Sequence, residues 1–104
     1  MKYKVTAIPV KDRVADFYEA LSNGTITNQK PDGAEIVASM KRAKMTESGK
    51  VEWFETCFCS SPLKHERETV LDCFFTHIET ELVEEFGEIE GLPYWQILEE
   101  SFKA

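Results

Sequence analysis

The stretch between Lys50 and Cys59 constrains the fold most, because it carries bulky side chains on both faces of a predicted strand. In an extended chain, alternate residues point to opposite sides of the sheet. One face then holds Val51, Trp53, Cys57 and Cys59, and the other holds Phe54 and Phe58. We therefore predict an inner strand that is covered on both sides.

The first part of the chain contains a strand followed by a helix. Apolar and polar residues alternate over Lys2–Val10, which predicts a half-buried strand. After Asp12, which can cap a helix, apolar residues recur at the spacing i, i+3, i+4, i+7. The Asn23-Gly24 pair is typical of a helix end, so we expect the helix to stop there.

The segment after the inner strand has the pattern of one long helix. Ser61 can act as its N-cap, and Pro62 suits the first helical position. Apolar residues recur at helical spacing up to Gly87, which is expected to end the element. We predict a helix over residues 62–86.

Two segments fit both a helix and a strand. Ala34–Met45 has the composition of a helix, but its apolar residues also alternate, and Glu47-Ser48-Gly49 can form a turn after it. We expect a strand here, paired as a hairpin with residues 50–59. Residues 93–102 fit either an edge strand or the first turns of a helix, and periodicity does not decide between them.

This element order, β-α-β-β-α, predicts a single α+β domain over residues 1–104. The expected fold is a ferredoxin-like two-layer sandwich, with an antiparallel sheet and two helices on one face. The order resembles small ferredoxin-like proteins, some of which pair their open sheets into dimers and bind small molecules between sheet and helices. We expect a homodimer, because the open face would otherwise expose apolar side chains. The resemblance is architectural and transfers no residue role.

Charge divides unevenly along the chain, whose formal net charge is −7. Residues 1–50 carry nine Lys and Arg against six Asp and Glu, and residues 51–104 carry three against thirteen. Such an acidic field repels phosphate and anionic lipid, so we expect neither nucleic-acid nor membrane binding. The acidic segment Glu79–Glu90 is either a solvated face or a docking surface for a basic protein partner.

Cysteine content and the start of the chain indicate the compartment. The chain has three cysteines, an odd number, and the residues after Met1 lack the apolar run of a signal peptide. No stretch of 18 apolar residues occurs. We expect a cytoplasmic protein with reduced thiols.

All three cysteines and both histidines lie between Cys57 and His77. Cys57 and Cys59 are two residues apart on a strand, so their side chains point to the same side. Cys73 and His77 are i, i+4 on the predicted long helix and share one of its faces. If these four converge, they supply the three thiolates and one imidazole of a closed zinc site. The alternative is that the cysteines only pack in the core.

The same window contains a candidate nucleophile. Cys59 lies just before the predicted helix N-terminus, where amide groups and the helix dipole lower the pKa of a thiol. His65, one turn inside the helix, is the candidate base, with His77 as the alternative. Glu55 or Glu66 can orient the imidazole. This arrangement predicts a thiol-dependent enzyme or redox protein.

Aromatic residues offer a third kind of site. Trp53, Tyr94 and Trp95, together with Cys57, could line a ligand pocket, although such residues more often belong to a core or an interface. Our leading hypothesis is a homodimeric module that binds a ligand or another protein. A thiol-dependent enzyme and a small metal-binding protein are the alternatives, and the sequence identifies no other cofactor.

Overall fold

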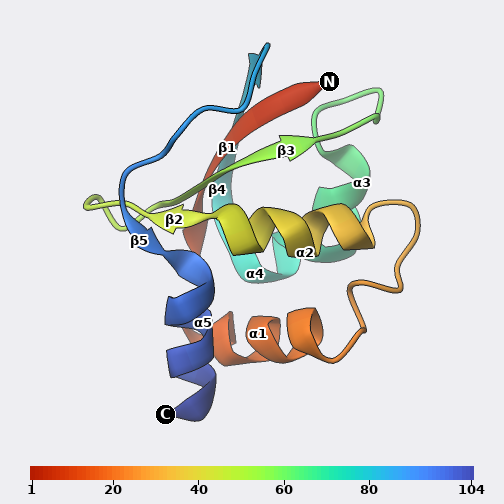
Figure 1. Cartoon of the computed structure of the whole chain (residues 1–104). Helices are drawn as coiled ribbons and strands as arrows, with labels where there is room; N and C mark the ends of the chain where they lie inside the picture. Colours follow the sequence, from red (N-terminus) through yellow and green to blue (C-terminus); the bar gives the residue numbers. More distant parts are fainter.

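The computed structural model describes all 104 residues and contains one five-stranded antiparallel sheet (Figure 1). Neighbouring strands follow the order β4-β1-β3-β2-β5. The strands are β1 (Lys2–Pro9), β2 (Lys44–Met45), β3 (Val51–Thr56), β4 (Phe75–Val83) and β5 (Leu92–Pro93). The predicted α+β class with an antiparallel sheet is confirmed.

Helices connect these strands and end the chain (Figure 1). They are α1 (Val14–Ser22), α2 (Gly33–Arg42), α3 (Lys64–Glu66), α4 (Asp72–Phe74) and α5 (Tyr94–Lys103). A 3-10 turn (Lys11–Arg13) precedes α1, and a π-helical turn (Arg67–Leu71) joins α3 to α4. No helix of the protein combines the length and the apolar character that crossing a membrane requires.

The two central strands confirm the predicted alternation. Val5 of β1 lies opposite Trp53 of β3, and Ala7 lies opposite Val51. All four side chains are buried. Residues opposite each other in an antiparallel pair share a face of the sheet, so these four form one wall of the core. β3 lies between β1 and β2, which confirms the prediction of an inner strand.

The other face of β3 is covered by the chain that follows β4. The ring of Phe54 stacks on that of Phe86 with 5.5 Å between ring centroids. The guanidinium carbon of Arg42 lies 5.0 Å from the same Phe86 ring. Part of the predicted second cover therefore comes from this chain itself. Phe58, which follows the end of the strand, is instead 89% exposed.

α1 forms where the helical spacing predicted it. Phe17 and Leu21, four residues apart, are buried, and the ring of Phe17 stacks on that of Phe74 with 4.5 Å between centroids. Asn23 ends the helix, and Gly24 follows with a φ of +91°. Glycine adopts this backbone conformation without the steric cost that other residues meet.

The predicted strand over Ala34–Met45 is wrong, because most of this segment forms α2. Ile36, Ser39 and Met40 are completely buried, and their i, i+3, i+4 spacing places them on one face of a helix. Only Lys44–Met45 pairs with β3 as the strand β2. The helix-forming composition of the segment prevailed, because an alternation this short also fits a helix.

The predicted single helix over residues 62–86 is also wrong. Helical backbone begins at Lys64 rather than after a Ser61 cap, and it ends at Phe74. Residues 75–83 form the edge strand β4, which pairs antiparallel with β1. Gly87 therefore ends no helix.

Aromatic packing explains where this helix stops. Phe75, the first residue of β4, is buried, and its ring centroid lies 5.5 Å from that of Phe17, 5.2 Å from that of Trp53 and 6.2 Å from that of Tyr94. The β-branched residues that alternate after it are Thr76, Ile78 and Thr80. Such alternation suits an extended strand beside β1.

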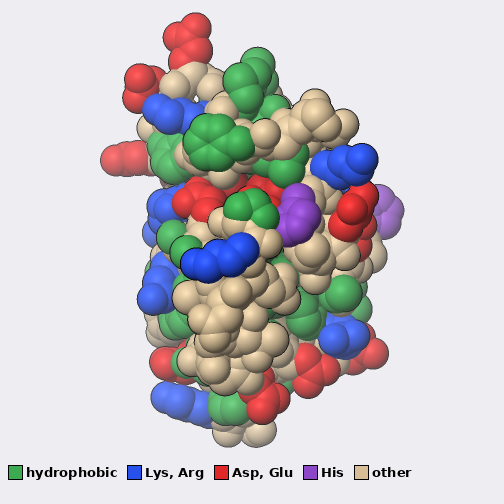
Figure 2. Space-filling model, turned by 90° about the vertical axis from the view of Figure 1, so that its right-hand side faces the viewer, with side chains coloured by type: hydrophobic (Ala, Val, Ile, Leu, Met, Phe, Trp, Pro, Cys, Tyr) green, Lys and Arg blue, Asp and Glu red, His purple; other side chains and the backbone are tan.

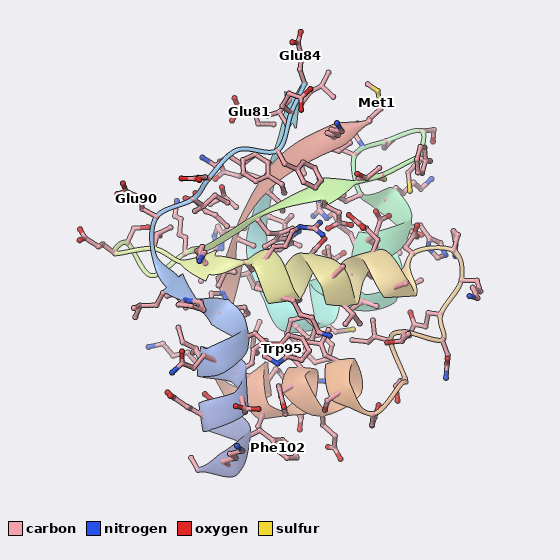
Figure 3. All side chains as sticks on the ribbon, viewed as in Figure 1. Met1, Glu81, Glu84, Glu90, Trp95 and Phe102 are labelled. Carbon is pink, nitrogen blue, oxygen red and sulfur yellow. The ribbon has the colours of Figure 1, made fainter.

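The segment left undecided by its sequence is helical. α5 buries Tyr94 and Leu98. Trp95 lies between α5 and α1 (Figure 3), where its ring centroid is 5.6 Å from that of Tyr18. Burial of one helix face against α1 decides in favour of the helix.

Candidate functional site

The end of β3 positions two thiols. The Cys57 amide donates a hydrogen bond to the Met1 carbonyl at 2.9 Å, and the Met1 amino group donates to the Cys57 carbonyl at 3.1 Å. The Cys59 amide donates to the Cys57 sulfur at 3.3 Å. These contacts fix the backbone on both sides of Cys57, so the two sulfur atoms lie close together.

The turn between β3 and α3 brings a carboxylate to these thiols. Leu63 has a φ of +56°, a left-handed conformation that residues other than glycine adopt rarely. Its side chain is completely buried, and this burial holds the turn in place. The chain then enters α3 in the direction that places Glu66 beside both sulfur atoms.

Glu66 accepts a hydrogen bond from each thiol. The Cys59 thiol donates to Glu66 Oε1 at 3.2 Å, and the Cys57 thiol donates to the same oxygen at 3.6 Å. Glu66 and Cys57 are buried, whereas Cys59 is half-buried. The cluster is therefore closed on its core side and accessible at Cys59.

A second buried carboxyl group lies beside Glu66. Glu55 extends from β3 into the core, and its Oε1 accepts a hydrogen bond from Trp53 Nε1 at 2.8 Å. The Oε2 atoms of Glu55 and Glu66 meet no N–H or hydroxyl donor. Each carboxyl group also shifts the pKa of the other, so the two lie close together, and one proton held between them would give their buried oxygens a partner.

Burial and charge decide where that proton resides. Burial, and after it the neighbouring Glu66, raise the pKa of Glu55 to about 9, although the hydrogen bond from Trp53 acts against them. Burial alone would raise the pKa of Glu66 too, but hydrogen bonds from Glu55 and the two thiols lower it. At neutral pH, Glu55 is therefore the carboxylic acid and Glu66 the carboxylate. Burial also raises the pKa of Cys57 to about 12, so this group remains a thiol.

The cluster has the dimensions of a small metal site. The ligand atoms of Cys57, Cys59 and Glu66 lie within 4.8 Å of one another. With Zn–S bonds of about 2.3 Å and Zn–O bonds of about 2.0–2.2 Å, neighbouring ligands of a tetrahedral zinc ion are about 3.5–3.8 Å apart. Two sulfur atoms and one carboxylate oxygen are ligands that zinc accepts.

His65 is not paired with Cys59 as the sequence predicted. Its Nδ1 atom is bonded to Asp32 Oδ2, whereas the Cys59 thiol is bonded to Glu66. Figure 2 shows the face that lies on the right in Figure 1. Acidic and basic side chains are interspersed on this face, and a histidine lies beside acidic side chains. The group positioned to accept a proton from Cys59 is therefore a carboxylate.

The other two predicted metal ligands lie outside the cluster. Cys73 is exposed in α4, and His77 is exposed on β4 with a φ of +52°. Because the helix ends between them, the predicted i, i+4 relation does not exist. Of the four predicted ligands, the structure brings together Cys57 and Cys59, and it adds Glu66.

The aromatic residues predicted to line one pocket lie in different places. Trp53 is completely buried in the core beside Glu55. Tyr94 lines a cavity near the start of β3, the end of that strand opposite to Cys57. Trp95 packs against α1, and Lys41 Nζ lies 5.2 Å from its ring centroid. These residues therefore share no single pocket.

The acidic segment Glu79–Glu90 belongs to β4 and to the loop that follows it. All of its glutamate side chains are exposed, and Glu84 and Glu90 point away from the body of the protein (Figure 3). β4 lies at an edge of the sheet. Its backbone is thus paired on one side only, and docking of a basic partner there stays a prediction.

Sequence reasoning treated Glu55 and Glu66 only as groups that orient an imidazole. One signal for a larger role was present, because Glu55 alternates with Trp53 and Cys57 and so falls on the predicted core face. A charged residue in such a place needs a partner or a proton. No comparable signal marked Glu66, whose position depends on the turn at Leu63.

Comparison of the chain with protein-family models, curated proteins and solved structures finds no match. Fold and site together define an α+β protein with a buried cluster of two thiols and two carboxyl groups. Any functional conclusion therefore depends on the chemistry of that cluster.

Proposed function

We propose that this protein binds a divalent transition-metal cation of the zinc type through Cys57, Cys59 and Glu66. The observation that carries the proposal is that their three ligand atoms lie within 4.8 Å of one another. Thiolates select borderline and soft cations over magnesium or calcium. Two thiolates and one carboxylate would leave a zinc centre with a charge of −1, which is within the range of known zinc sites.

Metal binding would release two protons. Each thiol donates its hydrogen to Glu66 in the structure, so each must lose a proton before its sulfur binds the cation. Glu66 is already the carboxylate. Affinity should therefore rise with pH at neutral values, by up to about 100-fold per pH unit for two displaced protons.

Glu55 would act on the ligand Glu66 rather than on the cation. Glu55 can keep its proton on the oxygen that faces Glu66. Trp53 Nε1 donates a hydrogen bond to the other oxygen of Glu55 at 2.8 Å. Such outer partners orient ligands and tune the metal. With three protein ligands, one coordination position stays open, and the half-buried side at Cys59 gives a water or small ligand access to it.

Titration with Co²⁺ tests this proposal. Cobalt adopts the same tetrahedral sites and absorbs through sulfur-to-metal charge transfer. We expect one equivalent to produce this absorption in reduced protein. Cys59→Ser and Glu66→Gln should weaken Co²⁺ binding by more than about 100-fold, beyond the 10–100-fold typical of an outer partner. Cys73→Ser is the matched control, because this exposed thiol lies outside the cluster.

Two outcomes would contradict the metal proposal. The first is the absence of charge-transfer absorption in reduced protein of native fold. The second is equal loss of absorption in Cys73→Ser and Cys59→Ser, because the cation would then bind exposed thiols without a built site.

A thiol-dependent activity is the second candidate, and one observation favours it. Cys59 is half-buried, and its thiol lies 3.2 Å from a carboxylate that can accept its proton. In this proposal Glu66 takes the role of base that the sequence assigned to His65. Faster alkylation of Cys59 than of the exposed Cys73 in metal-free protein, slowed by Glu66→Gln, would support it.

We also propose that the architecture is a ferredoxin-like sandwich with additions. The sequence β1, α1–α2, β2, β3, α3–α4, β4 follows the β-α-β-β-α-β order. β5 and α5 are additions to it. We also propose that two copies of the chain pair through the part of the open sheet face that Phe86 does not cover. The mass of the protein in solution tests whether such a dimer forms.

A further inference from the structure

A cavity of about 470 Å³ lies between the end of β1, the start of α1, the turn before β3 and α5. Its volume is within the range of about 300–1,000 Å³ that small-molecule sites occupy. Its apolar lining includes Ile8, Val14, Met45 and Ile97. Met45 pairs with Val51 at the first residue of β3, so the thiol cluster lies at the far end of that strand.

One polar group in this lining has no hydrogen-bond partner in the protein. Tyr94 is only 1% exposed, and its hydroxyl makes no hydrogen bond within the protein. Its position is fixed, because its amide donates to the Ala43 carbonyl at 2.9 Å and its ring packs on Phe75. The hydroxyl oxygen itself is not fully buried, and Tyr94 lines the cavity, so a molecule in the cavity can reach it. An unpartnered hydroxyl on a cavity wall therefore suits a ligand.

The charge of the cavity indicates which ligand fits. Lys11 and Asp12 both line it, and their opposite charges give the mouth no net charge. Burial raises the pKa of Tyr94, so its hydroxyl stays protonated and can donate. Lys11 and Ser101 of the lining are exposed. The cavity therefore offers apolar walls, no excess charge and one hydrogen-bond donor on a nearly buried side chain, that of Tyr94.

We propose that this cavity binds a small uncharged molecule that is apolar except for one hydrogen-bond-accepting oxygen, which the Tyr94 hydroxyl holds. The proposal is independent of the metal cluster. It follows the usual design of ligand sites, in which apolar walls supply affinity and a few placed polar groups fix orientation.

Two probes of equal shape test the role of the oxygen. Acetophenone carries a carbonyl where α-methylstyrene carries a methylene group. Each is titrated into the whole protein while the methyl NMR signals of Ile8, Met45 and Ile97 are followed. Ile36 in the core is the reference. We expect saturable shifts at the cavity methyls, with acetophenone binding about 3- to 10-fold more tightly, as one neutral hydrogen bond allows.

Tyrosine variants identify the donor. Tyr94→Phe keeps the ring and removes the hydroxyl, so it should remove the preference for acetophenone and leave α-methylstyrene binding unchanged. Tyr18→Phe is the matched control, because that hydroxyl is bonded to Glu99 outside the cavity. Ala15→Phe, on the exposed cavity wall, should block both probes.

Three results would overturn the proposal. If neither probe gives saturable shifts, the cavity binds no such molecule. Equal affinities in the unaltered protein, or a preference that survives Tyr94→Phe, would remove the role of the hydroxyl. Shifts of the same methyls on raising protein concentration alone would assign the cavity to a second copy of the chain.

Discussion

Glu66 is the residue on which the candidate site depends. It accepts hydrogen bonds from both thiols and lies beside Glu55, whose pKa it raises. A buried carboxylate is costly unless donors surround it, and here two thiols donate to one oxygen of Glu66. Removal of Glu66 would therefore leave two thiols and an acid without their acceptor, whereas a cation could replace the two thiol protons.

Replacing Glu55 by glutamine should flatten the pH dependence of stability. In the folded protein Glu55 holds its proton up to about pH 9, but in the unfolded chain it releases the proton near its ordinary pKa of about 4.3. Unfolding between these pH values thus releases a proton. The free energy of unfolding should fall as pH rises, by up to about 1.4 kcal/mol per pH unit.

Glutamine keeps an acceptor for Trp53 and a donor for Glu66 but does not titrate. Urea unfolding of metal-free protein at several pH values between about 5 and 8 should therefore show Glu55→Gln gaining stability over the unaltered protein as pH rises. The lowered pKa of Glu66 acts in the opposite sense, but only in acid below this window. A constant difference between the two proteins would show that Glu55 is ionised in the folded state.

At the residue scale, part of the site followed from the sequence. The period of two in a strand predicted Cys57 and Cys59 on one side. The strand β3 in fact ends at Thr56, before both cysteines, and the segment that follows it brings their sulfur atoms within 4.8 Å of each other. Glu66 was beyond such reasoning, because Leu63 adopts a left-handed φ that its residue type disfavours. Tertiary burial of that leucine, rather than local preference, sets the direction of α3.

At the element scale, the two errors of prediction share a cause. Segments 34–45 and 75–83 have apolar residues that fit both the helical and the strand period. Burial of Ile36 and Met40 beneath α2 decided the first. The place of Phe75 among three aromatic rings decided the second. Long-range packing of this kind leaves little trace in local periodicity.

The start of α2 offers a test of how tightly the elements are packed. A Cβ atom at Gly33 would lie 1.9 Å from the Ile26 carbonyl oxygen, a backbone atom that cannot rotate away. Gly33→Ala should therefore lower the free energy of unfolding by about 3 kcal/mol, the upper part of the usual range for overpacking. Urea unfolding measures this change.

Gly87→Ala is the matched control for this substitution. Its nearest neighbour would be the Phe54 ring at 3.5 Å, an ordinary contact. We expect a change within about 0.5 kcal/mol. Equal effects of the two substitutions would mean that the loop before α2 does not pack on it as closely as described.

At the scale of the whole molecule, charge separates along the chain. The glutamates of Glu79–Glu90 are exposed at an edge of the sheet, and no Lys or Arg occurs between Arg67 and Lys103. This distribution was readable from the sequence alone. The spatial arrangement was not, because the sequence predicted a helix where the edge strand β4 lies.

If the acidic segment is a docking surface, a short oligolysine peptide should bind it and dissociate as salt is raised. Changing Glu79, Glu81 and Glu84 to Gln should weaken this binding, measured by fluorescence anisotropy of labelled peptide. The same change at Glu19, Glu99 and Glu100 on the helices is the control. If both triple variants weaken peptide binding equally, the peptide responds to the net charge of the protein and not to the acidic segment.

Native mass spectrometry of reduced protein, purified without chelator and supplied with one equivalent of Zn²⁺, measures directly whether Cys57, Cys59 and Glu66 bind the cation. We predict a mass excess of one zinc ion per chain in the unaltered protein and in Cys73→Ser, and its loss in Glu66→Gln and Cys59→Ser. The same spectrum gives the number of chains in the assembly. A metal-free mass for the unaltered protein, or zinc retained by Glu66→Gln and Cys59→Ser, would contradict a site made of Cys57, Cys59 and Glu66.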